Sequence, residues 1–170
     1  YRNVCGTDCL AVRNPTDVDK DPLGALGQEN WMASCGGLFR TTQVTECYFD
    51  DPVPFLEWTY LAYKLSLDFR MKFVNVPTFR IHDTVASLSK SAAYREAELA
   101  VLRRISELGL PSQVHRVVRQ KRGRVCHDLS VHALREGRIG AAWRYHLHSV
   151  VQPDGWRYLT FSRKLLPFSG

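Results

Sequence analysis

The spacing of apolar residues in the second half of the chain most constrains its fold, because it predicts helices that end at short intervals. The first helix shows an apolar residue every three or four positions, in Ala97, Val101, Ile105 and Leu108. Glycine and proline turns close the successive helices at Gly109, Pro111 and Gly137, and again at "QPDG" near residue 154. We therefore expect residues 90–170 to form a bundle of short helical hairpins.

Charge divides the chain at about the same place. Residues 1–89 hold 8 basic and 11 acidic residues, a net charge of −3, whereas residues 90–170 hold 15 and 6, a net charge of +9. The densest basic cluster is His115–Arg124, which is either a solvated helix face or a surface that contacts a membrane carrying lipid-linked acceptors. It lacks the interleaved aromatic residues of a nucleic-acid binder, so no nucleic acid is expected as a partner.

The first half of the chain predicts a helix followed by a strand. Asp51 is a good N-cap and Pro52 suits the first helical position. A buried stripe then follows at helical spacing in Trp58, Leu61, Ala62 and Leu65, with Glu57 at its edge. The alternating segment Lys72–Ile81 is typical of a strand. The apolar segment Asn30–Arg40 predicts a strand pair or a bent strand, in which Gly36-Gly37 allows close backbone approach.

Cysteine usage and apolar content exclude two classes of protein. The five cysteines are odd in number and widely scattered, which argues against a disulfide framework and favours a reducing compartment. Cys5 and Cys9 are not followed by a second pair at zinc-binding spacing. No apolar run approaches the length of a membrane span. The first residue is not Met, so we expect the natural chain to be longer.

Three consecutive segments resemble the C-terminal half of a family-two inverting glycosyltransferase of the GT-A fold. They are "ENWMASCGGLFRTT", "YFDDPVPFLEWTYLAYKLSL" and "FVNVPTFRIHDTVASLS". The counterparts of that family's motifs are Arg40, Asp50-Asp51, Leu56-Glu57-Trp58 and Phe79-Arg80-Ile81-His82. The resemblance covers roughly residues 22–89. It implies an α+β fold, mostly α overall, with the acceptor-side part of the catalytic domain in residues 1–89 and an all-helical basic tail in residues 90–170.

The resemblance also implies roles for individual residues. Glu57 would be the general base that takes the proton of the acceptor hydroxyl. His82 would be a ligand of a divalent cation, Mg or Mn, that neutralises the leaving diphosphate. The residues implied to bind donor or acceptor are Trp58, Arg40, Gly36, Gly37 and Arg80. Each has a structural alternative. Glu57 could be a solvated helix carboxylate, His82 a capping or core histidine, and Trp58 a core residue. Arg40 and Arg80 could pair with Asp50 or Asp51, and Gly36-Gly37 could be only a bend in a strand.

Two departures from the family pattern argue against activity of this chain. Leu56 stands where the family usually has a second carboxylate. The nucleotide-binding half with its Asp-x-Asp motif is missing, and we reject Asp17-Val18-Asp19 as that motif because no buried strand precedes it. The chain by itself is therefore expected to have no glycosyltransferase activity.

The sequence thus predicts part of a cytoplasmic enzyme, with peripheral contact at the inner face of the cell membrane. Its partners would be a nucleotide-sugar and a glycan or glycolipid acceptor. Two alternatives stay open. One is a non-catalytic helical scaffold that binds a partner or an anionic surface through its basic tail. The other is an inactive glycosyltransferase-like regulator.

Overall fold

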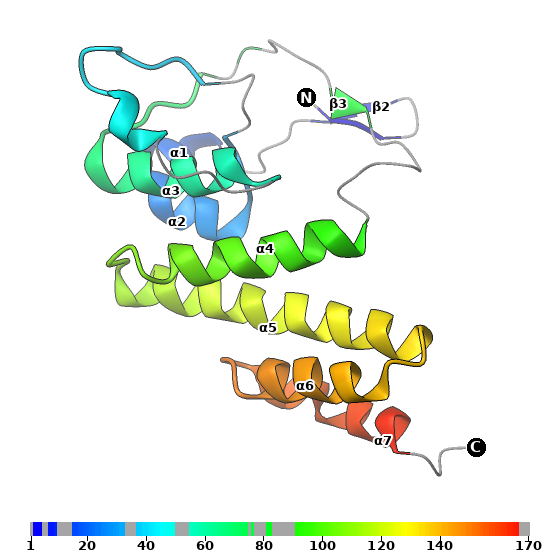
Figure 1. Ribbon diagram of the computed structural model, residues 1–170. Helices are drawn as coiled ribbons and strands as arrows, with labels where there is room; N and C mark the ends of the chain where they lie inside the picture. The colour runs from blue at the N-terminus through cyan, green and yellow to red at the C-terminus, as the bar shows by residue number, and fades with distance from the viewer. Residues whose placement is uncertain are drawn as a thin grey trace. The chain divides into compact units, whose positions relative to one another are not determined.

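The computed structural model forms two compact units, Tyr1–Ser87 and Leu88–Gly170, and each is treated by itself (Figure 1). The structure describes residues 2–4, 7–9, 15–32, 37–49, 55–74, 76, 81–82 and 91–166. That the two units correspond to a transferase half and a basic tail stays a prediction.

The first unit is built mainly from helices. These are α1 (Pro15–Lys20), α2 (Pro22–Gln28), the 3-10 helix η2 (Glu46–Tyr48) and α3 (Glu57–Asp68). Helix α2 begins where Asp21 accepts a hydrogen bond from the Gly24 backbone N–H at 2.9 Å, with Pro22 in the first turn. The rejected motif Asp17-Val18-Asp19 lies inside α1, where Val18 is fully buried.

Helix α3 supplies the core of the first unit. One side of it is buried through Leu61, Ala62, Tyr63 and Leu65. It packs on α2, and the Tyr63 hydroxyl donates a hydrogen bond of 3.1 Å to the Leu26 carbonyl. Burial raises the pKa of Tyr63 to about 12. The apolar stripe thus fixes which side of α3 faces solvent.

The expected α+β fold with a GT-A catalytic part is wrong, because the described structure is helical. Its strands are three segments of two or three residues, β1 (Arg2–Val4), β2 (Thr7–Cys9) and β3 (Ile81–His82), in the order β2-β1-β3. Strand β1 pairs antiparallel with β2 and parallel with β3.

Neither longer strand expected from the sequence is present in the described residues. Residues 30–32 and 37–40 have no regular structure, and among the described residues of Lys72–Ile81, which are 72–74, 76 and 81, Ile81 alone is in a strand. Val74 and Val76 are 66% and 60% exposed, so this alternating segment buries neither of them. A pattern with period two forms a strand only where a neighbouring strand or a core covers one face, and this segment has neither at those positions.

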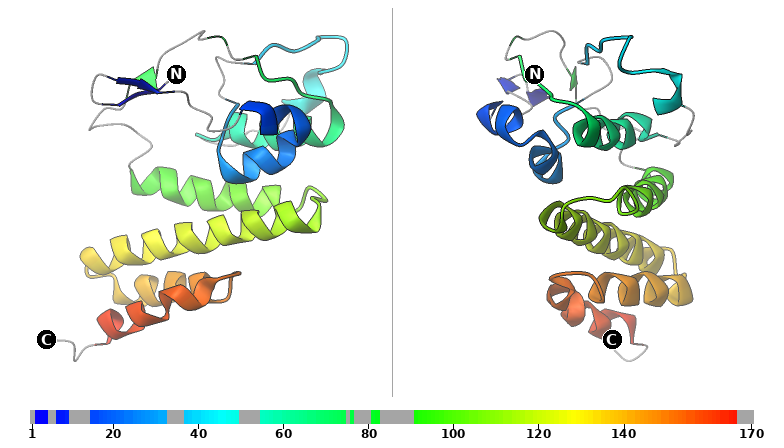
Figure 2. Two further views of the ribbon diagram at one scale, coloured as in Figure 1. Left: turned by 180° about the vertical axis from the view of Figure 1, so that it is seen from behind. Right: turned by 90° about the vertical axis from the view of Figure 1, so that its left-hand side faces the viewer.

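The second unit is a stack of antiparallel helices. They are α4 (Ala92–Ile105), α5 (Ser112–Arg135), α6 (Ile139–Val150), the 3-10 helix η4 (Gly155–Phe161) and α7 (Ser162–Leu165). Helix α4 packs on α5, α5 on α6, and α6 on η4 and α7 (Figure 2). Gly109 and Gly137 have φ of +64° and +73°, a left-handed conformation that allows the tight turns after α4 and α5.

The contact between α5 and α6 depends on small residues. Helix α5 is continuous through Gly123. A Cβ atom at this position would lie 3.0 Å from the Cβ of Gln152, so glycine lets the chain after α6 approach. Further along the interface, the buried Ser130 hydroxyl donates a hydrogen bond of 2.7 Å to the Ala142 carbonyl. Helices α5 and α6 are therefore closely packed.

Candidate functional site

Glu57, the predicted base, is the first residue of α3 and is exposed. Among the described residues its carboxylate has no hydrogen bond or ion pair. Leu56 precedes it as the N-cap and is 9% exposed, without a capping side chain. Phe55, one position earlier, has a φ of +68°, which is unusual for a residue with a side chain. The chain thus turns sharply into α3, burying residue 56 and presenting residue 57.

An aromatic pair joins the start of α3 to the preceding segment. The rings of Trp58 and Phe39 stack with centroids 6.3 Å apart and planes 15° apart. Trp58 is half-buried, so it is partly a core residue, as its place on the apolar stripe suggested. A Cβ at Gly37 would lie 2.5 Å from the Phe39 ring, so the position of that ring requires glycine there. Gly37, Trp58 and Glu57 are therefore brought to the same end of α3.

Arg40 continues the same segment. Its carbonyl accepts hydrogen bonds from the backbone N–H groups of Gln43 and Val44, which closes a turn. Its side chain is exposed and has no hydrogen bond or ion pair to any described residue.

The remaining predicted residues are not placed. Gly36 and Arg80 lie outside the described residues, and for His82 the structure describes the backbone of β3 but not the side chain. The meeting of Glu57 and His82 therefore stays a prediction. No cluster of three or more His, Cys, Asp or Glu gathers in the described part of the chain. The described residues alone do not offer a set of metal ligands, and no chemical step below relies on a metal.

A groove of about 540 Å³ lies between the segment after Gly37 and the C-terminal end of α3. Its lining combines aromatic and apolar side chains with two arginines, a carboxylate and an amide. The residues are Leu38, Phe39, Arg40, Gln43, Val44, Leu65, Asp68, Phe69, Arg70 and Met71. Of these, the sequence analysis singled out only Arg40 as a ligand-binding residue. The others carry no motif, and the groove forms only when two distant segments meet.

The 3-10 helix η2 packs against the wall of the groove at Asp68 and fixes its position. The Tyr48 hydroxyl donates a hydrogen bond of 2.8 Å to Asp68 Oδ2, and this bond is the main reason that the pKa of Tyr48 is raised. The Tyr48 ring also lies 5.6 Å from the ring of Phe69. Lys64 Nζ donates to the Tyr48 carbonyl at 3.1 Å, so η2 is attached to α3 at several points.

Glu57 and Asp68 mark opposite ends of α3. The helix has 12 residues, so about 16 Å separates its ends. Phe39 connects the two regions, because it stacks on Trp58 and also lines the groove. The surface from the carboxylate to the groove is therefore suited to a long ligand rather than a small one.

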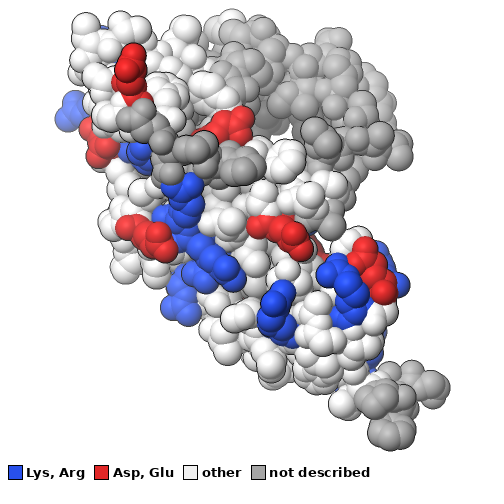
Figure 3. Space-filling view, viewed as in Figure 1, with Lys and Arg blue, Asp and Glu red and all other residues white. Residues whose placement is uncertain are grey.

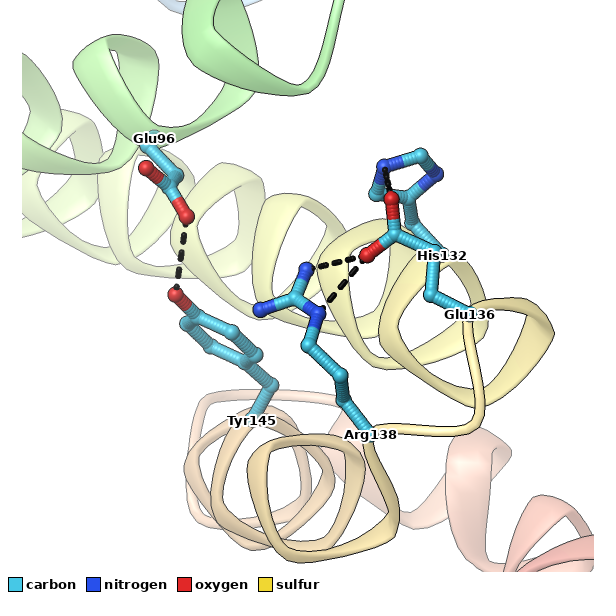
Figure 4. Close-up of polar contacts among 5 residues, drawn as sticks. All are labelled: Glu96, His132, Glu136, Arg138 and Tyr145. Carbon is cyan, nitrogen blue, oxygen red and sulfur yellow. Dashed lines mark hydrogen bonds and ion pairs between the residues drawn. The ribbon is translucent and has the colours of Figure 1, made fainter.

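The second unit carries a polar network at the turn between α5 and α6 (Figure 4). Glu136 binds His132 Nε2 at 3.1 Å and Arg138 Nε at 2.7 Å. The hydrogen bond from Arg138 lowers the pKa of Glu136. Tyr145 of α6 donates a long hydrogen bond of 3.4 Å to Glu96 of α4. The side chains of His132, Glu136 and Arg138 are each about half exposed, and their network fits a role in fixing the turn at Gly137.

No family model matches the chain, and no curated protein or solved structure is significantly similar to it. The likeness to glycosyltransferases therefore rests on the motifs in the sequence. No described helix is both long enough and apolar enough to cross a bilayer.

Proposed function

We propose that residues 22–89 form the acceptor side of a sugar-transferring site, with Glu57 as the general base. The observation that supports this is the arrangement at the start of α3. An exposed carboxylate, unpaired among the described residues, stands next to Trp58, and the Trp58 ring stacks on Phe39. The segment that carries Phe39 continues through Arg40 into the groove at the other end of the helix. The GT-A fold is not part of the proposal.

In this reaction Glu57 takes the proton from an acceptor hydroxyl as its oxygen attacks the anomeric carbon of the donor. The bond from that carbon to the phosphate oxygen breaks, and a nucleoside diphosphate leaves. The donor would be bound by a nucleotide-binding half in a longer protein. Trp58 has one ring face against Phe39, so its main task is to position the loop rather than to stack on a sugar.

The groove gives the acceptor a place to bind. Rings of Phe39 and Phe69 suit the apolar faces of sugar units, and Asp68, Gln43 and Arg40 can bind their hydroxyl groups. Because the groove extends toward the far end of α3, it would hold a part of the acceptor remote from the reacting hydroxyl. This favours a glycan or glycolipid over a single sugar as the acceptor.

The test uses a protein in which residues 1–170 are joined to a nucleotide-binding half, assayed for nucleotide-sugar turnover. Glu57→Gln should lower kcat by about 10²–10⁴-fold, the usual contribution of a general base. Donor binding should stay the same, because the carboxylate acts on the acceptor. Glu46→Gln is the matched control, since Glu46 is also an exposed carboxylate at the start of a helix. Equal activity of both variants would refute the role of Glu57.

A second candidate, a helical scaffold that binds an anionic partner, is favoured by the charge of the second unit. Its described residues, 91–166, hold 14 basic and 6 acidic residues. On the face shown in Figure 3, Lys and Arg form several groups with Asp and Glu between them, so the charge is not one uniform patch. Binding of the chain to vesicles of phosphatidylcholine with and without phosphatidylserine tests this candidate. Equal binding to both would argue against it.

A further inference from the structure

Three arginines lie on α4 and α5, the two helices that pack on each other, and two of them act electrostatically on the third. Arg119 and Arg122 lie three positions apart on α5 and so share a face of that helix. Arg103 belongs to the last turn of α4, which packs against α5. It is close enough to act electrostatically on Arg122, as is Arg119. The buried thiol of Cys126 lies one turn further along the same face of α5.

These positive charges lack a matching negative partner among the described residues. The Nε of Arg122 is buried and has no hydrogen-bond acceptor. Arg119 Nε reaches only the neutral amide oxygen of Gln152, at 3.3 Å. Glu107 is the one carboxylate that acts on Arg122, and it does so without forming an ion pair. Burial and the two neighbouring arginines together lower the pKa of Arg122, which reflects their repulsion.

A half-buried guanidinium whose N–H donor has no acceptor lowers the free energy of unfolding, unless a bound anion accepts that hydrogen bond. The anion that suits this place has more than one charge and several acceptor oxygens, because Arg103 and Arg119 add their positive charges to that of Arg122. A carboxylate offers one charge and two oxygens. A terminal phosphate offers three oxygens and nearly two charges.

We propose that the Arg103–Arg119–Arg122 cluster binds a terminal phosphate group. The phosphate could belong to a small molecule or to a lipid headgroup, and both present the same chemistry to the arginines. The site lies in the second unit and does not depend on sugar transfer at Glu57.

The first experiment measures binding of inorganic pyrophosphate to the whole chain by calorimetry and by NMR of the arginine Nε–H signals. The Arg122 signal should shift on addition of pyrophosphate. Arg122→Gln should weaken binding about tenfold or more, the contribution of one charge-assisted hydrogen bond. Arg124→Gln is the matched control, because Arg124 is exposed and lies about 200° round the same helix.

Arg103→Gln keeps the test valid if Arg122→Gln fails to fold, because Arg103 is exposed and its loss should not disturb packing. This variant should also weaken pyrophosphate binding, while the control should not. Absence of binding, or equal weakening by Arg124→Gln, would overturn the proposal, since it would show only a general effect of charge.

A second experiment separates the two sources of phosphate. Vesicles of phosphatidylcholine with phosphatidic acid present a terminal phosphate at a membrane surface. If these vesicles bind the chain and release it when Arg103 is replaced, the ligand is a headgroup. If pyrophosphate binds but the vesicles do not, the ligand is a small phosphate compound. Failure of both probes would overturn the site.

Discussion

The residue before the proposed base offers a sharp test of how the site is built. Leu56 occupies the position where the family-two glycosyltransferases, which these motifs resemble, usually have a second carboxylate. Its side chain, however, is only 9% exposed. Replacing it with Glu removes the burial of a leucine, which costs about 2–3 kcal/mol. A negative charge at the start of α3 interacts favourably with the helix dipole and stabilises the fold by about 0.3–1 kcal/mol. We therefore expect Leu56→Glu to lower the free energy of unfolding by about 2 kcal/mol.

Urea unfolding of the whole chain, followed by circular dichroism, measures this loss. Leu56→Met is the matched control, because a volume-conserving apolar exchange costs less than about 1.5 kcal/mol. In the longer protein, Leu56→Glu should not raise turnover, since residue 56 faces the core and only residue 57 faces solvent. A loss of unfolding free energy below about 0.5 kcal/mol, with raised turnover, would refute this account of the start of α3.

Two further predictions concern the end of the chain. Phe161→Ala should lower the free energy of unfolding by about 3–5 kcal/mol, because the side chain is 9% exposed and packs between the rings of His127 and His146. The control is Trp156→Ala, in the same 3-10 helix but 71% exposed, which should cost far less. Similar losses of unfolding free energy for both variants would contradict this packing. Burial lowers the pKa of both histidines, so the unfolded chain binds their protons more readily, and stability should fall as the pH drops below about 6.5. Melting temperatures at neutral and mildly acidic pH should show this fall, and it should shrink in His146→Asn but not in the exposed control His148→Asn.

The helices of the second unit could be predicted because their signals are local. Val101 and Ile105 are 1% and 0% exposed, as their place on the apolar stripe required. Gly109 and Gly137 take the left-handed conformation that ends a helix. A helix closes its hydrogen bonds within four residues, so spacing and turn residues carry most of the information.

The two longer strands are absent from the described residues, and the groove was not predicted, for the opposite reason: both depend on contacts between segments far apart in the sequence. Whether Val74 and Val76 belong to a strand depends on a partner that is remote in sequence, and none covers them. The groove likewise forms only because Phe39 and Arg40 meet Phe69 and its neighbours at the end of α3. Neither segment carries a sequence motif that predicts this contact. The sequence could propose Glu57, but it could not find the surface beside it.

The arginines of α5 show how packing changes the meaning of a charge pattern. A basic run on a helix is usually a solvated face, and that alternative was open for His115–Arg124. Helix α5, however, is covered by α4 on one side and α6 on another, so part of the run lies at the margins of two interfaces. Arg124 is exposed, whereas Arg122 is half-buried and its Nε has no acceptor among the described residues. A charge in that position destabilises the unit unless an anion accompanies it, so a bound phosphate should stabilise the unit against unfolding.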